Sequence, residues 1–428
     1  MKTHKFFMFA IVSSLLLLGS EQPSAYAQPY YDNFNLTEID LGLSGSQTLK
    51  EWYDAESSYT GNGTYFSAYI TLPVGDDLYI GLGTARAGEE DGAYLAKFDG
   101  SALSGIGDLD EQGFHEMIWD GSLVHIAGSD PTDDHTAGNH YTYQPGGSLT
   151  KYRDASNGLP NVVHSWGLWQ SGNTLYEAAS TYDNCASGDL CGQIFSSTDD
   201  GETWTKESDL GEYRAYDIFE FNGSLYAIYN DEYKNPLTLA KSTDNGKTWN
   251  DIPGLTENIR RVHIIEFNNE LLVVSWDRAK IYSLDASDNI STHNLPSLYK
   301  VGASYSATHY SDYNIMAVAD GYLYLIAEEQ GGAKHAIIRT TDLSNWEWTT
   351  NTNEKLTSLS YWENKNWLVT CTAGTNAKLL KIELQGTPSA VTMTSFQARN
   401  QGVTLWKVAA FLLSTSVLGF LKSKKWRN

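Results

Sequence analysis

The chain has 428 residues, enough for one large or two medium domains, and its 27 Tyr, 14 Phe and 13 Trp allow a sizeable buried core. Only 19% of the residues are charged, and the formal net charge is −23. A charge of this sign repels phosphate groups, which excludes nucleic acid and anionic lipid surfaces as the main partner.

Residues 1 to 27 have the pattern of a secretory signal peptide. Two lysines precede an apolar run from Phe6 to Leu18, and a small-residue cleavage pattern ends at Ala27. No cysteine directly follows the apolar run, so we do not expect a lipid anchor at this end. The sequence therefore predicts an exported protein.

A repeated segment occupies residues 28 to 386. Each copy has a turn residue, one spacer, a leucine and then an aromatic or aliphatic residue that starts a β-type run, as in GSLYAIYN. The leucines of the seven copies are separated by 45, 52, 50, 46, 52 and 45 residues, which indicates a repeat architecture. They are Leu78, Leu123, Leu175, Leu225, Leu271, Leu323 and Leu368.

Each repeat has the pattern of four short strands, and this region lacks a sustained helical period of apolar residues. Seven such units predict an all-β fold, a seven-bladed β-propeller. The last repeat lacks a fourth strand, whereas residues 34 to 42 form a strand-like segment before the first repeat. We expect this segment to complete the last blade and close the ring, which leaves no open sheet edge.

Acidic residues gather in two loops, residues 87 to 92 and 128 to 135. Several carboxylates together suit calcium, but solvated loops are the simpler interpretation. We therefore predict neither a bound metal nor a cofactor.

Cys185 and Cys191 flank a short polar loop in the third repeat. Because an exported protein meets oxidising conditions, we expect a local disulfide between them. The spacing does not match a zinc site, since no second Cys or His pair lies nearby.

The motif Ser-x-Asp-x-Gly-x-Thr-Trp, which we call the turn motif, falls between the third and fourth strands of two repeats. Its Asp can accept backbone N–H bonds, its Gly can adopt positive φ, and its Trp can bury a large apolar area. We therefore predict a structural role. The residues are Ser197, Asp199, Gly201 and Trp204 in the third repeat, Ser242, Asp244, Gly246 and Trp249 in the fourth, and Asp342 and Trp346 in a shorter copy in the sixth.

The turn motif resembles the Asp-box, or bacterial neuraminidase repeat, of the sialidase-like β-propeller superfamily. The resemblance covers about residues 30 to 385 and implies a propeller whose boxes lie on the outer rim, away from the active centre. Sialidases also have an Arg-Ile-Pro or Arg-Val-Pro motif in the first blade, part of an arginine triad that binds the substrate carboxylate. The first repeat here begins TYFSAYITLPV, and this stretch has no arginine. The resemblance therefore implies the fold without sialidase activity.

The repeats, aligned on their leucines, also predict a ligand site. Positions eleven and nine residues before the leucine lie near the start of each innermost strand, on one face, around the mouth of the central channel. In the third to fifth repeats they hold cationic and aromatic residues, which suit an anionic or carbohydrate ligand. The alternative is packing between blades, and a one-residue shift would reverse the face. The predicted residues are His164, Trp166, Arg214, Tyr216 and Arg260.

Residues 404 to 428 have the pattern of a membrane anchor that follows a spacer, residues 387 to 403. Val408 to Leu421 is uncharged, and four basic residues follow it. Counted from Leu405 the run has 17 residues, which make about 26 Å of helix. The basic tail would stay on the cytoplasmic side. The pattern also resembles bacterial surface-sorting signals, and a packed terminal helix is the alternative.

Together these features predict an exported, surface-anchored, monomeric propeller that binds an extracellular glycan or a surface protein and has no enzymatic activity. The alternative is a glycoside hydrolase of an extracellular polysaccharide, which would need two carboxylates about 5 to 10 Å apart. A purely structural surface protein is the third interpretation.

Overall fold

The computed structural model describes residues 34–59, 66–83, 92–131, 140–152, 159, 162–182, 185, 190–232, 236–302, 314–332 and 334–384. The predicted signal peptide, spacer and C-terminal anchor lie outside these ranges, as do most of the two acidic loops. Within them, no helix combines the length and apolar character that crossing a membrane requires.

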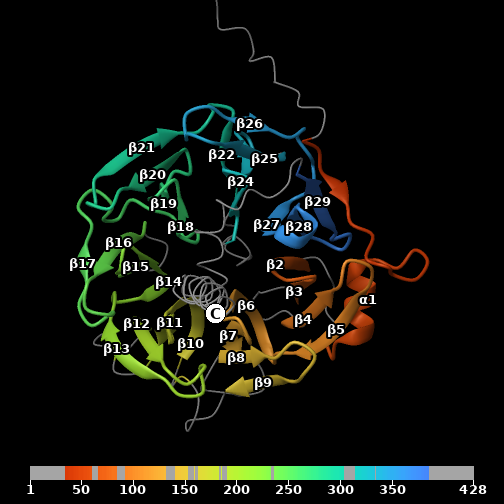
Figure 1. The fold of residues 1–428 in the computed structure, drawn as a ribbon, viewed down its shortest axis with the longest axis horizontal. Helices are drawn as coiled ribbons and strands as arrows, with labels where there is room; N and C mark the ends of the chain where they lie inside the picture. The colour runs from red at the N-terminus through yellow and green to blue at the C-terminus, as the bar shows by residue number, and fades with distance from the viewer. Residues whose placement is uncertain are drawn as a thin grey trace, which may run out of the picture.

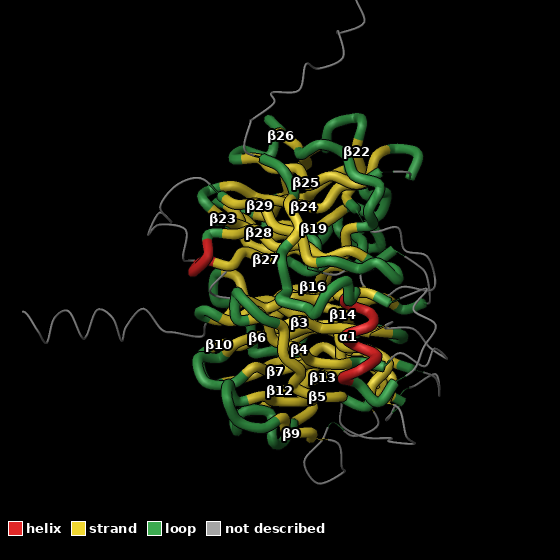
Figure 2. The backbone as a smooth tube through the Cα atoms, turned by 90° about the vertical axis from the view of Figure 1, so that its right-hand side faces the viewer, coloured by secondary structure: helices red, strands yellow, loops and turns green. Residues whose placement is uncertain are grey.

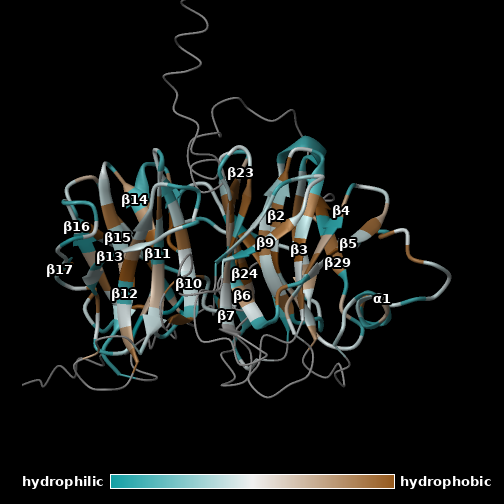
Figure 3. Ribbon diagram, turned by 90° about the horizontal axis from the view of Figure 1, so that it is seen from below, coloured by the Kyte–Doolittle hydropathy of each residue, from teal (hydrophilic) through white to brown (hydrophobic). Residues whose placement is uncertain are grey.

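The described residues form β-sheets arranged in a ring, the architecture of a β-propeller (Figure 1). The first strand of most repeats lies near the centre of the ring and the last lies near the rim (Figure 1). Figure 2 shows the strands from the side, with loops on the two opposite faces of the ring. Hydrophobic residues follow the strands and hydrophilic ones gather in the loops (Figure 3), as expected for sheets that pack face to face. The predicted propeller fold is confirmed.

Five sheets have four or five strands each. The first repeat contains β2 (Ser67–Val74), β3 (Asp77–Gly83), β4 (Tyr94–Phe98) and β5 (Leu103–Asp108). The fourth contains β14 (Arg214–Phe221), β15 (Ser224–Asn230), β16 (Thr238–Ser242) and β17 (Asn250–Asp251). The fifth contains β18 (Ile265–Phe267), β19 (Glu270–Val274), β20 (Lys280–Leu284) and β21 (Ile290–Asn294). The sixth contains β22 (Tyr299–Val301), β23 (Met316–Ala319), β24 (Tyr322–Glu329), β25 (His335–Thr340) and β26 (Glu347–Trp348).

The last repeat confirms the predicted closure of the ring. It contains β27 (Leu356–Trp362), β28 (Trp367–Thr372) and β29 (Leu379–Glu383), with a 3-10 turn, η1 (Glu363–Lys365), between the first two. Its fourth strand is β1 (Thr37–Glu38), which pairs with β29 antiparallel. The N-terminal and C-terminal parts of the propeller are thereby hydrogen-bonded in one sheet.

The second and third repeats form one sheet of eight strands rather than two separate sheets. Its strands are β6 (Glu111–Trp119), β7 (Val124–Pro131), β8 (His140–Tyr143), β9 (Leu149–Tyr152), β10 (Val162–Ser171), β11 (Thr174–Thr181), β12 (Cys191–Ser197) and β13 (Thr205–Asp209). The prediction of seven separate four-stranded sheets is therefore wrong here. The cause is local, because β10 and β7 come close enough to pair at one position, His164 with Ser129.

One helix, α1 (Leu49–Glu56), lies on the outside of the ring near β5 (Figure 1), where no helix was predicted. Thr48 caps it, since its hydroxyl accepts from Glu51 N and the Glu51 carboxylate accepts from Thr48 N. Its own residues Trp52 and Tyr53 are buried. Eight residues are too few for a helical apolar period to stand out, whereas the capping pair was a visible signal.

Six of the seven repeat leucines are buried, and the seventh, Leu123, lies in a turn. The Asp120 carboxylate accepts from Ser122 N and Leu123 N, which forms a tight turn between β6 and β7. Val124 begins β7 and takes the buried position instead. The second repeat is thus shifted by one residue relative to an alignment on leucines.

The two full copies of the turn motif make the same hydrogen bonds. Asp199 accepts from the backbone N–H of Thr203 at 2.9 Å and from its hydroxyl at 2.5 Å, and Gly201 N donates to Ser197 Oγ at 3.0 Å. Trp204 Nε1 donates to Gly201 O at 3.0 Å.

In the second copy Asp244 accepts from the backbone N–H of Thr248 at 2.9 Å and from its hydroxyl at 2.6 Å. Gly246 N donates to Ser242 Oγ at 2.9 Å, and Trp249 Nε1 donates to Gly246 O at 3.0 Å. Hydrogen bonds from the hydroxyl and the backbone of Thr248 lower the pKa of Asp244 to about 2. Both glycines have φ of 83°. In the shorter copy Leu343 holds the positive φ, and Asp342 accepts from Ser344 N and Asn345 N.

Candidate functional site

The innermost strands of the first four repeats each contain a β-bulge at the same place. A bulge adds one residue to the strand and turns its side chain out of the regular alternation, and bulges are common beside functional sites. The added residues are Tyr69 in β2, His115 in β6, Trp166 in β10 and Tyr216 in β14. The residues that follow them are Ile70, Glu116, Gly167 and Asp217.

Trp166 lies at the centre of a cluster of cationic and aromatic side chains. Its ring centroid is 4.2 Å from that of His115, 4.7 Å from that of His164 and 5.3 Å from that of Tyr216. The guanidinium carbons of two arginines lie 5.2 and 4.9 Å from the same centroid. We call this group the inner cluster, and its members are His115, His164, Trp166, Arg214, Tyr216 and Arg261.

Four of the five predicted ligand-site residues belong to the inner cluster, and Arg260 is the exception. Its guanidinium lies over the ring of Trp276 at 5.4 Å, whereas Arg261 lies over Trp166 and Tyr216. Regular strand structure begins only at Ile265, so the two-residue alternation on which the prediction depended does not reach residue 260.

His115 was missed because of the shift in the second repeat. Alignment on Leu123 selects Gln112 and Phe114 as the two site positions of this repeat. In the structure Val124 takes the place of the leucine, so the second site position moves one residue along the chain, from Phe114 to His115. The Asp-Gly-Ser before Leu123 is nearly the same as the Asn-Gly-Ser before Leu225, where the register is not shifted, so no turn residue in the sequence marks the shift.

The aromatic members of the inner cluster are buried rather than exposed at a channel mouth. Trp166 is 0% exposed and Tyr216 is 5% exposed. Packing between blades, the alternative interpretation, therefore accounts for these two rings. A ligand would have to be bound by the guanidinium and imidazole groups of the cluster.

His164 is neutral and orients Arg214. Burial first, and then the charges of Arg214 and Arg261, hold the pKa of His164 well below its usual range. Its Nε2 lies 3.2 Å from Arg214 Nη2 and accepts from it, so its Nδ1 carries the proton and donates to Ser129 Oγ at 3.0 Å. Ser129, His164 and Arg214 thus form a hydrogen-bonded row from β7 to β10 to β14.

His115 is neutral for the same reasons. Burial first, and then the charge of Arg261, hold the pKa of His115 well below its usual range. The positive charge of the inner cluster is therefore carried by its two arginines.

Arg214 has hydrogen-bonding capacity that its protein neighbours do not use. Arg214 is 8% exposed, and its Nε has no hydrogen-bond partner among the described residues. No ion pair found in the described ranges includes Arg214. A buried guanidinium without a carboxylate is costly, because the charge has lost its water and gained no opposite charge.

Glu116, Asp217 and His263 form a second group beside the inner cluster, and all three are buried. His263 Nδ1 lies 2.8 Å from Glu116 Oε2 and 3.3 Å from Asp217 Oδ1. Among the described residues this is the group whose donor atoms lie close enough together to hold a metal ion.

A third set of buried polar residues joins the second and third repeats, and we call it the polar chain. His125 Nε2 lies 3.0 Å from Asp120 Oδ2, and its Nδ1 lies 3.2 Å from His140 Nε2. His140 Nδ1 lies 3.1 Å from Glu177 Oε2, and Glu177 Oε1 accepts from the hydroxyl of Ser165. Burial raises the pKa of Glu177 well above its usual value and lowers that of His140, so both groups favour their neutral forms.

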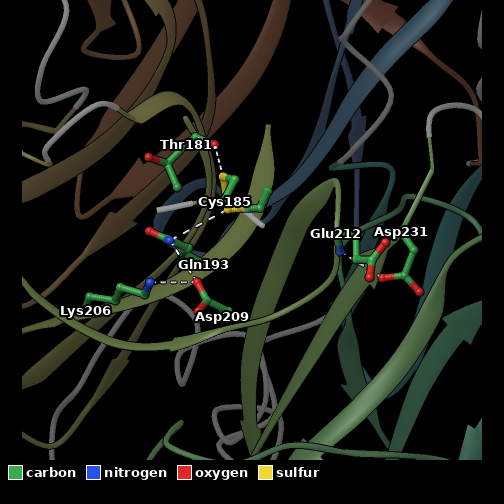
Figure 4. Close-up of a disulfide and its surroundings, with 8 residues drawn as sticks. Thr181, Cys185, Gln193, Lys206, Asp209, Glu212 and Asp231 are labelled. Atoms are coloured by element: carbon green, nitrogen blue, oxygen red, sulfur yellow. Dashed lines mark hydrogen bonds and ion pairs between the residues drawn. A yellow bond between two sulfur atoms is a disulfide. The ribbon is translucent and has the colours of Figure 1, made fainter. Parts of the chain in front are cut away.

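The structure contains a disulfide between Cys185 and Cys191, the pair singled out in the sequence, with Cα atoms 5.6 Å apart (Figure 4). Close to it, Gln193 and Lys206 both contact the Asp209 carboxylate. The disulfide borders a cavity of about 460 Å³ whose charged lining residues are Asp209, Glu212, Asp231, Lys247 and Asp251. This mainly acidic lining does not suit an anionic ligand.

No family model matches the chain, and no curated protein matches it. Solved β-propeller structures do resemble it in fold. A streptogramin B lyase is 14% identical, with a TM-score of 0.52 over 82% of this chain and 97% of the lyase. A catalytically inactive virginiamycin B lyase from Staphylococcus aureus, solved with quinupristin, has the same identity and TM-score over 82% of this chain and 99% of its own. A puromycin hydrolase mutant is 11% identical, with a TM-score of 0.53 over 76% of this chain and 52% of the hydrolase. Identities this low establish a shared β-propeller fold alone.

Proposed function

We propose that this β-propeller is a binding module that recognises an anionic ligand, in the first place a carboxylate-bearing saccharide, through Arg214 and Arg261. The observation that carries the proposal is the buried Arg214, whose Nε has no partner and whose charge has no carboxylate beside it in the described part of the chain. A guanidinium binds a carboxylate through two parallel hydrogen bonds, and the bond is stronger where water is excluded. Arg261 is partly exposed, which gives the ligand an approach to the buried charge.

We also propose that the ring has seven blades of the sialidase-like type. In support, β6 to β9 and β10 to β13 are each a complete antiparallel four-stranded unit, and the register joins them at the pair His164 and Ser129. The turn motif and its hydrogen bonds support the same assignment.

The proposed setting is outside the cell, with the protein monomeric and tethered through residues 404 to 428. The signal-peptide pattern of residues 1 to 27 supports export. The disulfide between Cys185 and Cys191 supports an oxidising compartment.

A glycan array with the purified full-length protein tests the binding proposal. We expect acidic saccharides to bind and their neutral counterparts not to bind. Arg214→Gln and Arg261→Gln should each weaken binding at least tenfold, because each removes a charge-assisted pair. Arg339→Gln is the matched control, since Arg339 is a partly buried arginine that already pairs with Glu347 at 2.7 Å. Equal binding of neutral saccharides, or unchanged binding by both inner-cluster variants, would overturn the proposal.

Glycoside hydrolysis is the second candidate, and the closeness of Glu116 and Asp217 favours it. Their donor atoms lie within 4.8 Å of each other, near the short end of the separations that glycosidases use. Against it, both carboxylates contact His263, and two backbone N–H groups hold Asp217. Sugar release from the bound saccharide, lost in Glu116→Gln, would favour hydrolysis over binding alone.

A further inference from the structure

Three innermost strands or their extensions bring potential metal ligands to one point. Glu116 and Asp217 are each the first residue after the bulge in β6 and β14. His263 follows Asp217 by 46 residues, the same interval that separates Leu225 from Leu271. The three side chains therefore occupy equivalent positions in the second, fourth and fifth repeats and converge from three directions.

The third repeat, which lies between them, contributes a glycine at this position. A methyl group added at Gly167 would lie 2.8 Å from Asp217 Cα and 2.9 Å from Asp217 Oδ1. Any side chain there would displace the Asp217 carboxylate. Gly167 thus leaves the space in which the three donor groups meet.

The distances between the donor atoms fit a metal ion. His263 Nδ1 is 2.8 Å from Glu116 Oε2 and 3.3 Å from Asp217 Oδ1. Metal–ligand bonds of about 2.0–2.2 Å place neighbouring ligand atoms about 3.0–3.5 Å apart. Small side-chain movements would bring all three atoms into contact with one ion.

Two backbone N–H groups fix the orientation of the Asp217 carboxylate, as hydrogen bonds to the ligating side chains do in metal sites. Its Oδ1 accepts from Ile218 N at 2.9 Å and its Oδ2 accepts from Ile264 N at 2.6 Å. Ile264 directly follows His263, so the same hydrogen bond also positions the imidazole. The carboxylate is therefore held in place before any ion arrives.

The charges in this group also favour a cation. Glu116 and Asp217 are each 2% exposed and His263 is 3% exposed. Two buried carboxylates whose oxygens lie within 4.8 Å of each other and of an imidazole nitrogen favour a divalent cation, whose charge can offset both. One nitrogen and two carboxylate oxygens are a ligand set that suits Zn²⁺ or Mn²⁺ better than Ca²⁺.

We propose that Glu116, Asp217 and His263 bind one divalent transition-metal ion at the centre of the propeller, with Zn²⁺ as the preferred ion. The ion would have three protein ligands and at least one position left for water or a ligand atom. The site does not depend on the proposed binding of an anion by Arg214 and Arg261, because it uses different side chains.

Titration calorimetry of the full-length, chelator-treated protein with Zn²⁺ alone tests the site. We expect one ion per chain, with an affinity at least 100-fold weaker in Glu116→Gln and in His263→Gln. Glu177→Gln is the matched control, because Glu177 is also a buried carboxylate beside a histidine, His140, but among the described residues it belongs to no group of three donor atoms close enough to hold an ion. It should bind Zn²⁺ as the wild type does.

X-ray absorption at the zinc edge on the wild-type protein keeps the test independent of how the variants fold. We expect a first shell with one imidazole nitrogen and carboxylate oxygens. Absence of stoichiometric Zn²⁺ binding, an affinity unchanged by both ligand substitutions, or a shell with sulfur or several imidazoles would overturn the proposal. Loss of acidic-saccharide binding in Arg214→Gln with Zn²⁺ binding intact would separate the two sites.

Discussion

The contact between the second and third repeats differs in chemistry from the contacts that join the fifth, sixth and seventh repeats. The first contains the polar chain, whose members His125, His140, Glu177 and Ser165 are all 0% exposed. The second is a continuous apolar cluster that includes Leu325 and Leu359. The same four-stranded backbone thus permits either directional hydrogen bonds or apolar packing, and the sequence of each repeat decides which.

The two copies of the turn motif teach the same lesson on a smaller scale. Their internal hydrogen bonds match, but their surroundings do not. A methyl group added at Gly201 would lie 2.4 Å from Nε2 of His140, in the polar chain, whereas one added at Gly246 would lie 3.5 Å from Ile194 Cγ2. A motif that looks structural and interchangeable therefore packs against the polar chain in one copy and against apolar residues in the other.

The largest expected effect is at the apolar contact. Leu325→Ala should lower the free energy of unfolding by about 2–5 kcal/mol, because Leu325 is fully buried and the substitution leaves a cavity. Urea denaturation measures the change. Leu298→Ala is the control, since Leu298 is 44% exposed and should cost far less. Equal costs would show that the apolar cluster is not what holds these repeats together.

The next effect is a pH dependence of the polar chain. The pKa of Glu177 is raised in the folded protein, so the folded state keeps a proton that the unfolded state loses above its ordinary pKa. As pH rises from about 5, this group therefore lowers stability, by up to about 1.4 kcal/mol per pH unit, until the folded pKa is passed.

Glu177→Gln removes this dependence, because an amide does not ionise. The free energy of unfolding of the wild type minus that of Glu177→Gln should fall as the pH rises from 5 to 7. The contribution of His140, whose lowered pKa costs stability as pH falls below about 6.5, is common to both proteins and cancels. A difference that is constant with pH would show that Glu177 is ionised in the folded protein.

The smallest effect compares the two glycines of the turn motif. Gly201→Ala and Gly246→Ala share a backbone cost of about 1–2 kcal/mol, because both residues have φ of 83°. Gly201→Ala should cost about 1 kcal/mol more, since its methyl group would displace His140 and disturb the polar chain. Thermal melts of both variants measure the difference, and identical melting temperatures would mean that His140 moves aside freely.

The architecture was predictable because it depends on patterns that repeat. The leucine period predicted the propeller, and the missing fourth strand of the last repeat led to β1 as its partner. The turn motif was placed correctly because Asp, Gly and Trp each act within a few residues. Helix α1 was not predicted because eight residues are too few to show a helical period. The joining of the second and third sheets was not predicted because pairing of β7 with β10 depends on how closely the two strands approach in space.

The inner cluster was only partly predictable, because its members lie where the strands are irregular. Trp166 and Tyr216 occupy bulges, and Arg261 precedes the regular part of its strand, so alternation does not determine where these side chains point. Glu116 and Asp217 follow bulges for the same reason. His115 was missed because the alignment used Leu123, whereas Val124 takes the equivalent position in the structure.

Diffraction from crystals of the full-length protein grown with selenate tests the central claim, that Arg214 is held at the centre of the ring for an anion. Selenate carries an anomalous scatterer and a charge that a guanidinium binds. The account predicts an anomalous peak with an oxygen about 3 Å from Arg214 Nε. A carboxylate of the chain itself at that nitrogen, or selenate bound only elsewhere on the surface, would contradict it.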